Sequence, residues 1–488
     1  MNYFKSLFLL CVFLWAQLSF AQKSKPNLVI LLADQHSYDE LGCYGNTQVK
    51  TPNIDKFAKE GIRFNQCFSN EPICTPFRGL LMSGQHSLKN GCYTNDVPLI
   101  PGNGKKLAEV LRDNGYNTAY IGKWHLLGGD RNRPIPRGEM RYGFDETFLT
   151  DNCTTQFEAG KAYYWDDNDE KVIFNKWQPY GQTDQALEYL DSRKNVDKPF
   201  VMVVAWHPPH NVGKEIGLDG KKHYTYKAPE ELMALYNPDM IKVRPGIKST
   251  PDLRRMYQGH YAMITGIDKA FGAIMDKLKA LNLDENTIVV YSADHGDLLE
   301  HFDINEPKQH PQDYSSRIPF LMRWPKHLKA GTSTNLLFGA MDMMPTLLGL
   351  MNMPVPKECD GKNLSKAILT GNPKAVDYVP YWCFPERTRG VFTQNYTFST
   401  EKNGTQKSVN NVLYDRKNDP YQLTNLFGDI RYKTIQADLL KLTYSAMKKY
   451  GDNFYNMQQA KLITEKIKAQ NPENPYLKPD LRPRKPSE

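Results

Sequence analysis

The stretch NLVILLADQH, residues 27–36, decides the fold class. Its first seven residues are apolar apart from Asn27, which is typical of a parallel strand buried on both faces. Similar strand candidates and helix candidates alternate along the next part of the chain. The strand candidates are NTAYIG (117–122), PFVMVVAW (199–206) and NTIVVYSA (286–293), and the helix candidates include 104–114 and 257–281. This alternation predicts an α/β domain built on a mostly parallel sheet.

The pattern of apolar and polar residues changes after about residue 355. The short aromatic runs YVPYWCF, RGVFTQN and YTFSTE, with a turn at Lys402-Asn403-Gly404, predict a small antiparallel sheet. An amphipathic helix is expected over 429–450, ended by Gly451. We therefore expect an α/β domain over 22–355, an α+β subdomain over 356–470 and an extended Pro-rich tail over 471–488.

Residues 1–21 have the anatomy of a secretory signal peptide. Lys5 precedes an apolar run from Leu7 to Phe20, and small residues lie near a plausible cleavage point at Ala21. The run is too short to span a bilayer, and its Cys11 has too little apolar sequence before it to favour a lipoprotein. The sequence predicts a bacterial periplasmic or secreted protein without membrane insertion.

Charge and cysteine content narrow the class of protein. The formal net charge of +8 mildly favours anionic partners, but no basic run with interleaved aromatic residues points to nucleic acid. Removal of the signal peptide would leave an odd number of the eight cysteines. Cysteines in an exported chain tend to pair, so an unpaired one needs an explanation. The others show no C-x-x-C metal spacing and could form disulfides or stay reduced; they are Cys43, Cys67, Cys92, Cys153, Cys359 and Cys383.

Polar side chains follow each predicted strand of the parallel sheet. The four strand endings are Asp34-Gln35-His36, Lys123-Trp124-His125, His207-Pro208-Pro209-His210 and Asp294-His295-Gly296-Asp297. Ligands of open parallel sheets bind beyond the carboxyl ends of the strands. Because all four endings contain the same chemical types, we predict that they share one active site.

The residue types at these strand ends indicate a metal ion and an anionic substrate. Asp34, Gln35, Asp294 and His295 offer mostly hard oxygen ligands, which suit calcium or magnesium better than zinc. Lys123 and His125, two residues apart, could together bind an anionic group and transfer a proton. A single histidine such as His125 is more often a hydrogen-bonded loop residue, and His207 beside His210 is ambiguous in the same way.

Cys74 in the stretch NEPICTPFRGLLMSG, residues 70–84, is the candidate for the odd thiol. Thr75 is a good N-cap, and the following proline suits a first helical turn, so a short helix ending at Gly84 is expected, although Gly79 weakens it. Cys74 would then lie just before a helix N-terminus, where anions are stabilised, with Arg78 one turn further on. A thiolate, or a derivative that meets an anionic substrate, suits this position.

These residues resemble a known family. Cys74-Thr75-Pro76-Phe77-Arg78 is similar to the C-x-P-x-R signature of the type I sulfatases, in which the cysteine is oxidised to Cα-formylglycine (3-oxoalanine). The motifs LLADQ, GKWHL, PPH, SADHGD and LYDRKNDPYQLTNLF follow the family's order from about residue 26 to residue 427. The resemblance implies an alkaline-phosphatase-like fold and a sulfuric ester hydrolase.

The resemblance assigns roles to the matching positions. One Ca²⁺ ion would be bound by the modified Cys74 together with Asp34, Gln35, Asp294 and His295. The catalytic residues it implies, besides Cys74, are Arg78, Lys123, His125, His210 (preferred to His207) and Lys308. The last of these lies nine residues before Arg317 in KQHPQDYSSRIP. Two positions depart from the common pattern: Phe77 replaces a serine, and Gln35 replaces the second aspartate of an Asp-Asp pair.

The family mechanism implies a chemical reason for the modified cysteine. The hydrated formylglycine attacks sulfur while calcium, Lys123, Lys308 and Arg78 neutralise the sulfate oxygens. His210 or Lys308 protonates the leaving sugar oxygen. His125 then takes the proton of the second hydroxyl, so that sulfate is expelled and the aldehyde is restored. Cys74 is thus interpreted as a precursor of the nucleophile.

The resemblance also implies the partners. These are a sulfated oligo- or polysaccharide as substrate and a formylglycine-generating or anaerobic sulfatase-maturating enzyme. Ulvan, carrageenan and glycosaminoglycans are candidate substrates, of which an algal polysaccharide such as ulvan is favoured, with specificity loops around 151–177 and 223–244. Two alternatives stay open: a phosphodiesterase or phosphonate hydrolase of the alkaline-phosphatase superfamily, and a non-catalytic binder of sulfated glycans.

Overall fold

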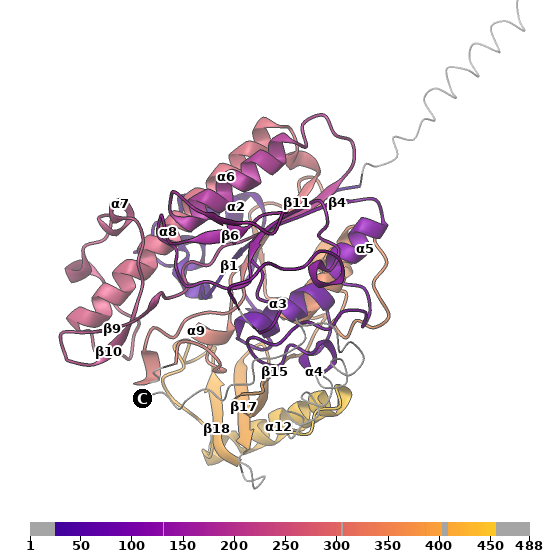
Figure 1. Cartoon of the computed structure of the whole chain (residues 1–488). Coiled ribbons are helices and arrows are strands. Elements are labelled where there is room, and N and C mark those ends of the chain that lie inside the picture. The colour runs from indigo at the N-terminus through magenta and orange to yellow at the C-terminus, as the bar shows by residue number, and fades with distance from the viewer. Residues whose placement is uncertain (1–24, 130, 304–305, 386, 403–407, 455–488) are drawn as a thin grey trace, which may run out of the picture.

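A central ten-stranded sheet organises the chain in the computed structural model, which describes residues 25–454 except 130, 304–305, 386 and 403–407 (Figure 1). Its strands, in spatial order, are β13 (Thr332–Thr334), β2 (Ile62–Phe64), β12 (Phe320–Arg323), β11 (Thr287–Ala293), β1 (Asn27–Ala33), β8 (Phe200–Ala205), β4 (Asn117–Lys123), β5 (Thr147–Asp151), β6 (Tyr163–Trp165) and β7 (Lys171–Ile173). The five strands from β11 to β5 are mutually parallel, and antiparallel pairs lie toward both edges. The predicted α/β class with a mostly parallel sheet is confirmed.

The register of the parallel strands gathers the polar strand ends at one edge. Ala33 pairs with Ala293, so the two following aspartates leave the sheet side by side. On the other side, Lys123 pairs with Asp151. All seven residues of β1 are buried, which explains why this strand is apolar nearly throughout.

Helices cover both faces of the sheet. Figure 1 shows α2, α6 and α8 on one face, with α3 and α5 on the other. The predicted helix over 104–114 is shorter than expected, because it begins only at Leu107, whereas the one over 257–281 begins earlier, at Pro251 behind a Thr250 N-cap. The helices of the α/β region are α2 (Pro52–Glu60), α3 (Cys74–Ser83), α4 (Ser87–Asn90), α5 (Leu107–Asp113), α6 (Gln178–Asp191), α7 (Glu230–Met233), α8 (Pro251–Ala280), α9 (Asp313–Ser316) and α10 (Ala340–Leu350).

Helix α3 differs from the prediction at its start. The N-cap is Ile73, with extended backbone, and Cys74 is the first helical residue, so the expected Thr75 N-cap is wrong. The reason is that the Thr75 hydroxyl donates to the backbone oxygen of His125 at 2.9 Å instead of capping its own helix. Gly79 is explained by packing, because a Cβ there would lie 2.7 Å from the Cys92 side chain. Gly84 ends the helix in the left-handed conformation, as expected.

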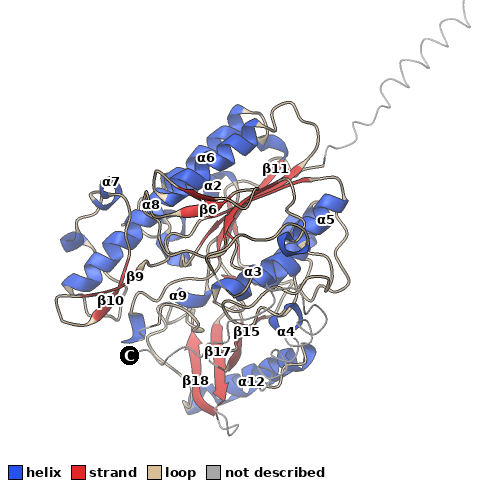
Figure 2. Cartoon of the chain, in the orientation of Figure 1, coloured by secondary structure: helices blue, strands red, loops and turns tan. Residues whose placement is uncertain are grey.

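The C-terminal region contains the predicted antiparallel sheet, drawn below the α/β layers in Figure 2. Its apolar face packs on α12, where Val391, Phe398, Leu413 and Leu439 form a small second core. The predicted turn at 402–404, the signal peptide and the tail lie wholly or partly outside the described residues. The elements are α11 (Ser365–Thr370), β15 (Val379–Cys383), β16 (Thr388–Phe392), β17 (Tyr396–Lys402), β18 (Ser408–Asp415) and α12 (Lys433–Lys449); two further small sheets pair β3 (Cys67–Phe68) with β14 (Phe338–Gly339) and β9 (Gly213–Ile216) with β10 (Lys222–Thr225).

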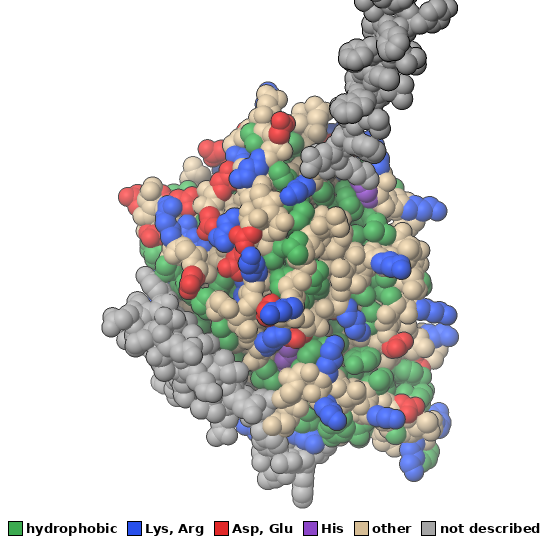
Figure 3. Space-filling model, turned by 90° about the vertical axis from the view of Figure 1, so that its right-hand side faces the viewer, with side chains coloured by type: hydrophobic (Ala, Val, Ile, Leu, Met, Phe, Trp, Pro, Cys, Tyr) green, Lys and Arg blue, Asp and Glu red, His purple; other side chains and the backbone are tan. Residues whose placement is uncertain are grey.

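The surface and the cysteines add two observations. On the face drawn in Figure 3, Lys and Arg side chains are scattered among acidic ones and form no continuous basic patch. None of the helices in the described ranges has the length and apolar character that crossing a membrane requires. Six cysteines, namely Cys43, Cys67, Cys74, Cys92, Cys153 and Cys359, form no disulfide in the described part of the chain.

A buried carboxyl, Glu71, joins the loop before α3 to the C-terminal sheet. It accepts hydrogen bonds from the Ser87 hydroxyl at 2.6 Å, the Trp382 indole at 2.7 Å and the Phe384 backbone at 3.3 Å. Burial raises the pKa of Glu71 to about 8, although these hydrogen bonds favour the charged form. The folded protein therefore keeps a proton that the unfolded chain releases above pH 4.5 or so.

Replacing Glu71 by glutamine is expected to flatten the pH dependence of stability. The stability contributed by the neutral carboxyl is fully present below the unfolded pKa and is lost as the pH rises toward about 8. The loss approaches about 1.4 kcal/mol per pH unit in that window. Urea unfolding between pH 5 and pH 9 measures this change in the free energy of unfolding. Glu230→Gln, at an exposed position, is the control. An unchanged pH slope in Glu71→Gln would refute this account.

Candidate active site

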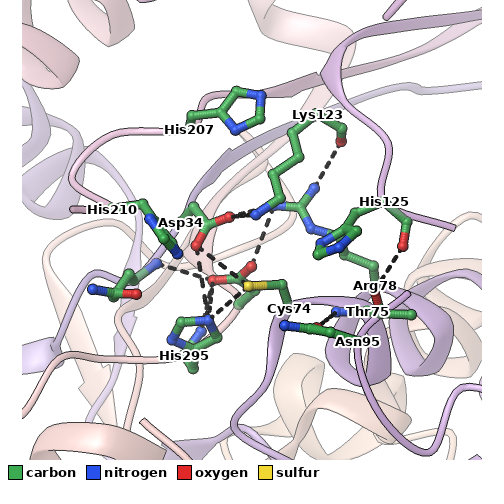
Figure 4. A network of polar contacts seen from close by, with 12 residues as sticks. Asp34, Cys74, Thr75, Arg78, Asn95, Lys123, His125, His207, His210 and His295 are labelled. Atoms are coloured by element: carbon green, nitrogen blue, oxygen red, sulfur yellow. Dashed lines mark hydrogen bonds and ion pairs between the residues drawn. The ribbon is translucent and has the colours of Figure 1, made fainter. Parts of the chain in front are cut away.

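Cys74, the first residue of α3, lies at the centre of the gathered strand ends (Figure 4). Its Sγ atom is 3.1 Å from Lys308 Nζ, 3.2 Å from His295 Nε2 and 3.7 Å from Asp34 Oδ1. The thiol is 1% exposed. The structure therefore brings the signature cysteine, the lysine from the loop before α9 and the ends of β1 and β11 into direct contact.

Two cations hold the Asp34 carboxylate from one side. Its Oδ2 atom pairs with Lys123 and, at 3.3 Å, with Arg78. The same guanidinium bonds to Asp294 Oδ2 at 3.2 Å and to the Lys123 backbone oxygen at 2.8 Å. Burial and the Cys74 thiolate oppose ionisation of Asp34, but the charges of Lys123, His210 and Arg78 hold its pKa below the usual range. The Oδ1 atom of Asp34 thus stays an ionised oxygen facing the thiol.

Gln35 presents an amide oxygen at this site. The residue has a left-handed φ of 64°, and its backbone N–H donates to Asp294 Oδ1 at 3.0 Å. Its Nε2 atom donates to Asp297 Oδ2 at 2.6 Å, and that same oxygen accepts a bond from the Tyr226 hydroxyl at 2.5 Å. The amide orientation is therefore fixed. Its Oε1 atom is buried without a hydrogen-bond partner among the described residues, which is the condition expected of a metal ligand.

The donor set fits a hard divalent cation. Ligand atoms of Asp34, Cys74, Asp294 and His295 all lie within 4.8 Å of one another and are buried. His295 Nδ1 lies 2.9 Å from the Gly296 carbonyl, which can only accept, so Nδ1 carries the proton and Nε2 is free to act as a ligand. Carboxylate and amide oxygens with one imidazole suit calcium, and the Cys74 sulfur completes the group of buried donor atoms.

Fixed positive charge governs the thiol. Burial alone would raise the pKa of Cys74, but the charges of Lys123, Lys308 and His295 hold it well below its usual value. The ammonium groups of Lys123 and Lys308 would also stabilise the oxygens of a bound sulfate at position 74, whereas His295 is a metal ligand. The site thus places the Cys74 side chain beside positively charged groups that can bind a tetrahedral anion.

His210 and Lys308 form a proton-bearing pair beside the thiol. The Nδ1 atom of His210 lies 2.8 Å from the Asn211 carbonyl, so it donates there, and Nε2 accepts from Lys308 Nζ at 3.2 Å. Burial and the neighbouring ammonium lower the pKa of His210. The exchangeable proton of the pair therefore resides on Lys308.

His207, the alternative histidine of the same strand ending, has a different environment. Its Nε2 atom lies 2.9 and 3.0 Å from the two carboxylate oxygens of Asp151, the last residue of β5. Figure 4 draws no contact between His207 and the residues around Cys74. The geometry thus separates the two histidines, with His210 beside Lys308 and His207 hydrogen-bonded to the buried Asp151.

His125 lies beside the first turn of α3 and is 2% exposed. Its Nε2 atom is 3.0 Å from Asp96 Oδ1. Burial opposes a charged ring, but the Cys153 thiolate and the hydrogen bond to Asp96 raise the pKa of His125 to about 10. The predicted site residues thus lie around Cys74, and two carboxylates that had no predicted role support them: Asp297, from a predicted strand ending, and Asp96, which was not predicted.

The two supporting carboxylates differ in how far the sequence pattern indicates their position at the site. Asp297 belongs to the strand ending Asp294-His295-Gly296-Asp297, so its proximity could have been anticipated, but its partner Gln35 could not. Asp96 lies in a segment without regular secondary structure, 29 residues before His125. No periodicity or motif marks it, and only the tertiary fold brings it to the histidine.

The mostly parallel sheet and the thiol surrounded by carboxylates, lysines and histidines define an alkaline-phosphatase-like sulfatase. Comparison with known proteins agrees. Residues 26–353 match the sequence pattern of the family described as Sulfatase, and residues 304–449 match the C-terminal region of N-sulphoglucosamine sulphohydrolase. The chain belongs to the sulfatase family.

Individual relatives extend this finding. An ulvan-active sulfatase of Formosa agariphila is 33% identical over 89% of this chain and 83% of its own length. An endo-4-O-sulfatase of Bacteroides thetaiotaomicron is 26% identical over 91% of this chain and 96% of its own. A solved structure from Bacteroides fragilis bearing the sulfatase name YidJ superposes with a TM-score of 0.79 at 30% identity, covering 89% of this chain and 98% of that one.

Proposed function

We propose that the protein removes sulfate from a sulfated polysaccharide or oligosaccharide through a formylglycine made from Cys74. The observation that carries the proposal is the contact set of the Cys74 sulfur, with Lys308 at 3.1 Å and His295 at 3.2 Å. A maturation enzyme of the host would supply the oxidation, for which Cys74, Pro76 and Arg78 form the required signature. A hydrated aldehyde supplies two hydroxyls, one to attack sulfur and one to release it.

The cations of the chain bind and polarise the sulfate. The Lys308 ammonium contacts position 74, the Lys123 ammonium pairs with Asp34, and Arg78 is held in place by Asp34 and Asp294. All of them are at least nine-tenths buried, so little water competes for the sulfate oxygens. Because these charges are fixed before substrate arrives, they stabilise the transition state without reorganisation.

Proton transfer falls to two separate groups. Lys308 protonates the leaving sugar oxygen and regains a proton from water after the product leaves, and His210 Nε2 accepts its hydrogen bond and so orients the ammonium. His125 takes the proton of the second hydroxyl at position 74, which restores the aldehyde. Lys308 starts protonated, whereas His125 accepts a proton only when its ring is neutral. Conversion of Cys74 to an aldehyde removes the thiol whose hydrogen bond helps to raise the pKa of His125, and so favours the neutral ring.

One calcium ion fits the oxygen donors described above. Asp34, Gln35, Asp294 and His295 would hold it with the modified side chain 74. When bound, the ion supplies positive charge to the sulfate and to the attacking hydroxyl. The amide oxygen of Gln35, buried and without a partner in the described part of the chain, supports this assignment despite the lost charge of the usual aspartate.

Calcium is expected to stabilise the protein, and Gln35→Ala to weaken that effect. At 100 times its dissociation constant, the ion should add about 2.7 kcal/mol to the free energy of unfolding. Loss of one ligand should raise the calcium concentration for half-maximal stabilisation about 10- to 100-fold. The melting temperature of chelator-treated protein, measured against calcium concentration, tests this. Gln48→Ala is the control, because the native Gln48 side chain bonds to the Lys242 backbone instead of lying at the site. No thermal shift with calcium in the parent protein would remove the metal from the proposal.

An algal polysaccharide such as ulvan, with its sulfated rhamnose, is the favoured substrate. The relative with 33% identity carries the name ulvan-active sulfatase, and the endo-4-O-sulfatase relative widens the class to other sulfated glycans. The candidate specificity loops are the segments 151–177, which follows β5 and contains β6 and β7, and 223–244, which runs from β10 through α7. Release of sulfate from defined ulvan, carrageenan and glycosaminoglycan oligosaccharides decides among these substrates.

The proposal includes a bacterial periplasmic or secreted location, based on the sequence of residues 1–21. One experiment separates it from the alternatives: purified protein is assayed with an aryl sulfate, an aryl phosphate diester and an aryl phosphonate. Preferred release from the sulfate supports the proposal. Preference for phosphorus esters would indicate a phosphodiesterase or phosphonate hydrolase, and binding of sulfated glycan without turnover would indicate a non-catalytic binder.

A further inference from the structure

We propose that Asp96 is a positioning residue of this active site, which fixes the imidazole of His125 with Nε2 on the carboxylate and Nδ1 left for the reaction. The inference rests on the proposed function, in which His125 acts as the base. Neither the strand-end pattern nor the signature motif includes Asp96.

The carboxylate of Asp96 is itself fixed by Arg131. The guanidinium donates from Nε to Oδ1 and from Nη2 to Oδ2, both at 2.7 Å, which is a bidentate clamp. Because a clamped carboxylate is ionised and only accepts, His125 Nε2, at 3.0 Å, must carry a proton. The tautomer of the neutral ring is thereby determined.

The other ring nitrogen of His125 is available. Nδ1 is buried and forms no hydrogen bond of normal geometry among the described residues. The Cys74 side chain is near enough to act on the charge of the ring. Among the described residues no nitrogen or oxygen atom binds Nδ1, and the thiols of Cys153 and Cys74 act on the ring. Nδ1 is therefore the atom that can accept a proton at position 74 once the ring is neutral.

The backbone around Asp96 ties the nucleophile to the base. The neighbouring Asn95 accepts a hydrogen bond from the Thr75 backbone N–H at 3.1 Å through its Oδ1. The Thr75 hydroxyl in turn donates to the backbone oxygen of His125 at 2.9 Å. The adjacent residues Asn95 and Asp96 thus fix the start of α3 and the His125 imidazole relative to each other.

Backbone strain supports a functional reason for this arrangement. Asp96 has a φ of 62° and His125 a φ of 56°, both in the left-handed region that costs non-glycine residues energy. Such conformations persist where the surroundings impose them, and they cluster at active sites. The Asp96 side chain is 33% exposed, so it could be hydrated without a histidine partner and does not need the contact for its own stability.

Replacing Asp96 by alanine or asparagine tests the proposal. Without the carboxylate, the ring can exchange tautomers and turn, so kcat should fall about 30- to 100-fold. KM should change less than about threefold, since Lys123, Lys308 and Arg78 still bind sulfate. At a pH at which the His125 ring is neutral, NMR of ¹⁵N-histidine-labelled protein should show the Nε2-protonated tautomer of His125 in the parent and a mixture in Asp96→Ala.

Two matched variants control the experiment. Arg131→Gln leaves the carboxylate in place and should lower kcat less than Asp96→Ala does, while keeping the tautomer. Asp145→Asn breaks another Asp–Arg pair, with Arg112 at 2.6 Å, and should leave kcat and the His125 signals unchanged.

The outcomes are distinct. An unchanged tautomer in Asp96→Ala, or a kcat within threefold of the parent, would overturn the role of Asp96. If the parent protein hydrolysed no sulfate ester, the proposed function would fail, while the NMR comparison would still decide whether Asp96 orients His125.

Discussion

Replacing Cys74 by alanine is expected to lower kcat for sulfate ester hydrolysis by at least about 10³-fold. Alanine leaves the sulfate cradle intact but provides no oxygen to attack sulfur, so binding persists and turnover is lost. Lys308 and His295 contact the sulfur directly, and no other described nucleophile is held between them. Sulfate release from an aryl sulfate and from a sulfated oligosaccharide, together with the affinity for a substrate analogue, measures the effect.

Cys92→Ala is the matched control for this experiment. Cys92 is another fully buried thiol, and it packs against α3 at Gly79, so its loss tests general damage to the helix. Burial raises the pKa of Cys92, which makes it unreactive. We expect the kcat of Cys92→Ala to stay within about threefold of that of the parent protein. Substantial turnover by Cys74→Ala would show that another group attacks sulfur.

Replacing Lys308 by alanine should have the second-largest effect, and the effect should depend on the leaving group. On a sugar sulfate, loss of both charge and proton donor should lower kcat about 10³- to 10⁴-fold. An aryl sulfate has a leaving group that needs no proton, so only the loss of charge stabilisation, about 10²-fold, should remain. The ratio of the two rates measures the proton transfer.

Two further variants distinguish Lys308 from its partner. Lys308→Arg keeps the positive charge but holds its proton too tightly to donate it, so aryl sulfate hydrolysis should recover more than sugar sulfate hydrolysis. His210→Ala should lower both rates less, because it removes only the hydrogen-bond acceptor that orients the Lys308 ammonium. If His210→Ala showed the strong leaving-group dependence and Lys308→Ala showed none, the assigned roles would be reversed.

The α/β fold and most of the site were predictable because they depend on local patterns. Buried parallel strands must be apolar, as in β1, and their carboxyl ends must meet at one edge, which placed Asp34, Lys123, His210 and Asp294 together. The pairing of Ala33 with Ala293 gives this expectation its physical basis.

The residues that were not predicted depend on contacts distant in sequence. Thr75 was expected to cap α3, but its hydroxyl reaches His125 instead. The orientation of the Gln35 amide is decided by Asp297, 262 residues later. Asp96 lies in an irregular segment whose strained backbone only the assembled fold can impose. Local propensity gives no information on such pairings.

Mass spectrometry of the tryptic peptide Phe64–Arg78 from active protein is the most direct test of the central claim. This peptide contains Cys67 and Cys74, so alkylation of the denatured protein provides an internal control. We predict that Cys67 is alkylated, whereas position 74 carries an aldehyde that reacts with a hydrazine. An alkylated, unmodified thiol at Cys74 in fully active protein would contradict the account.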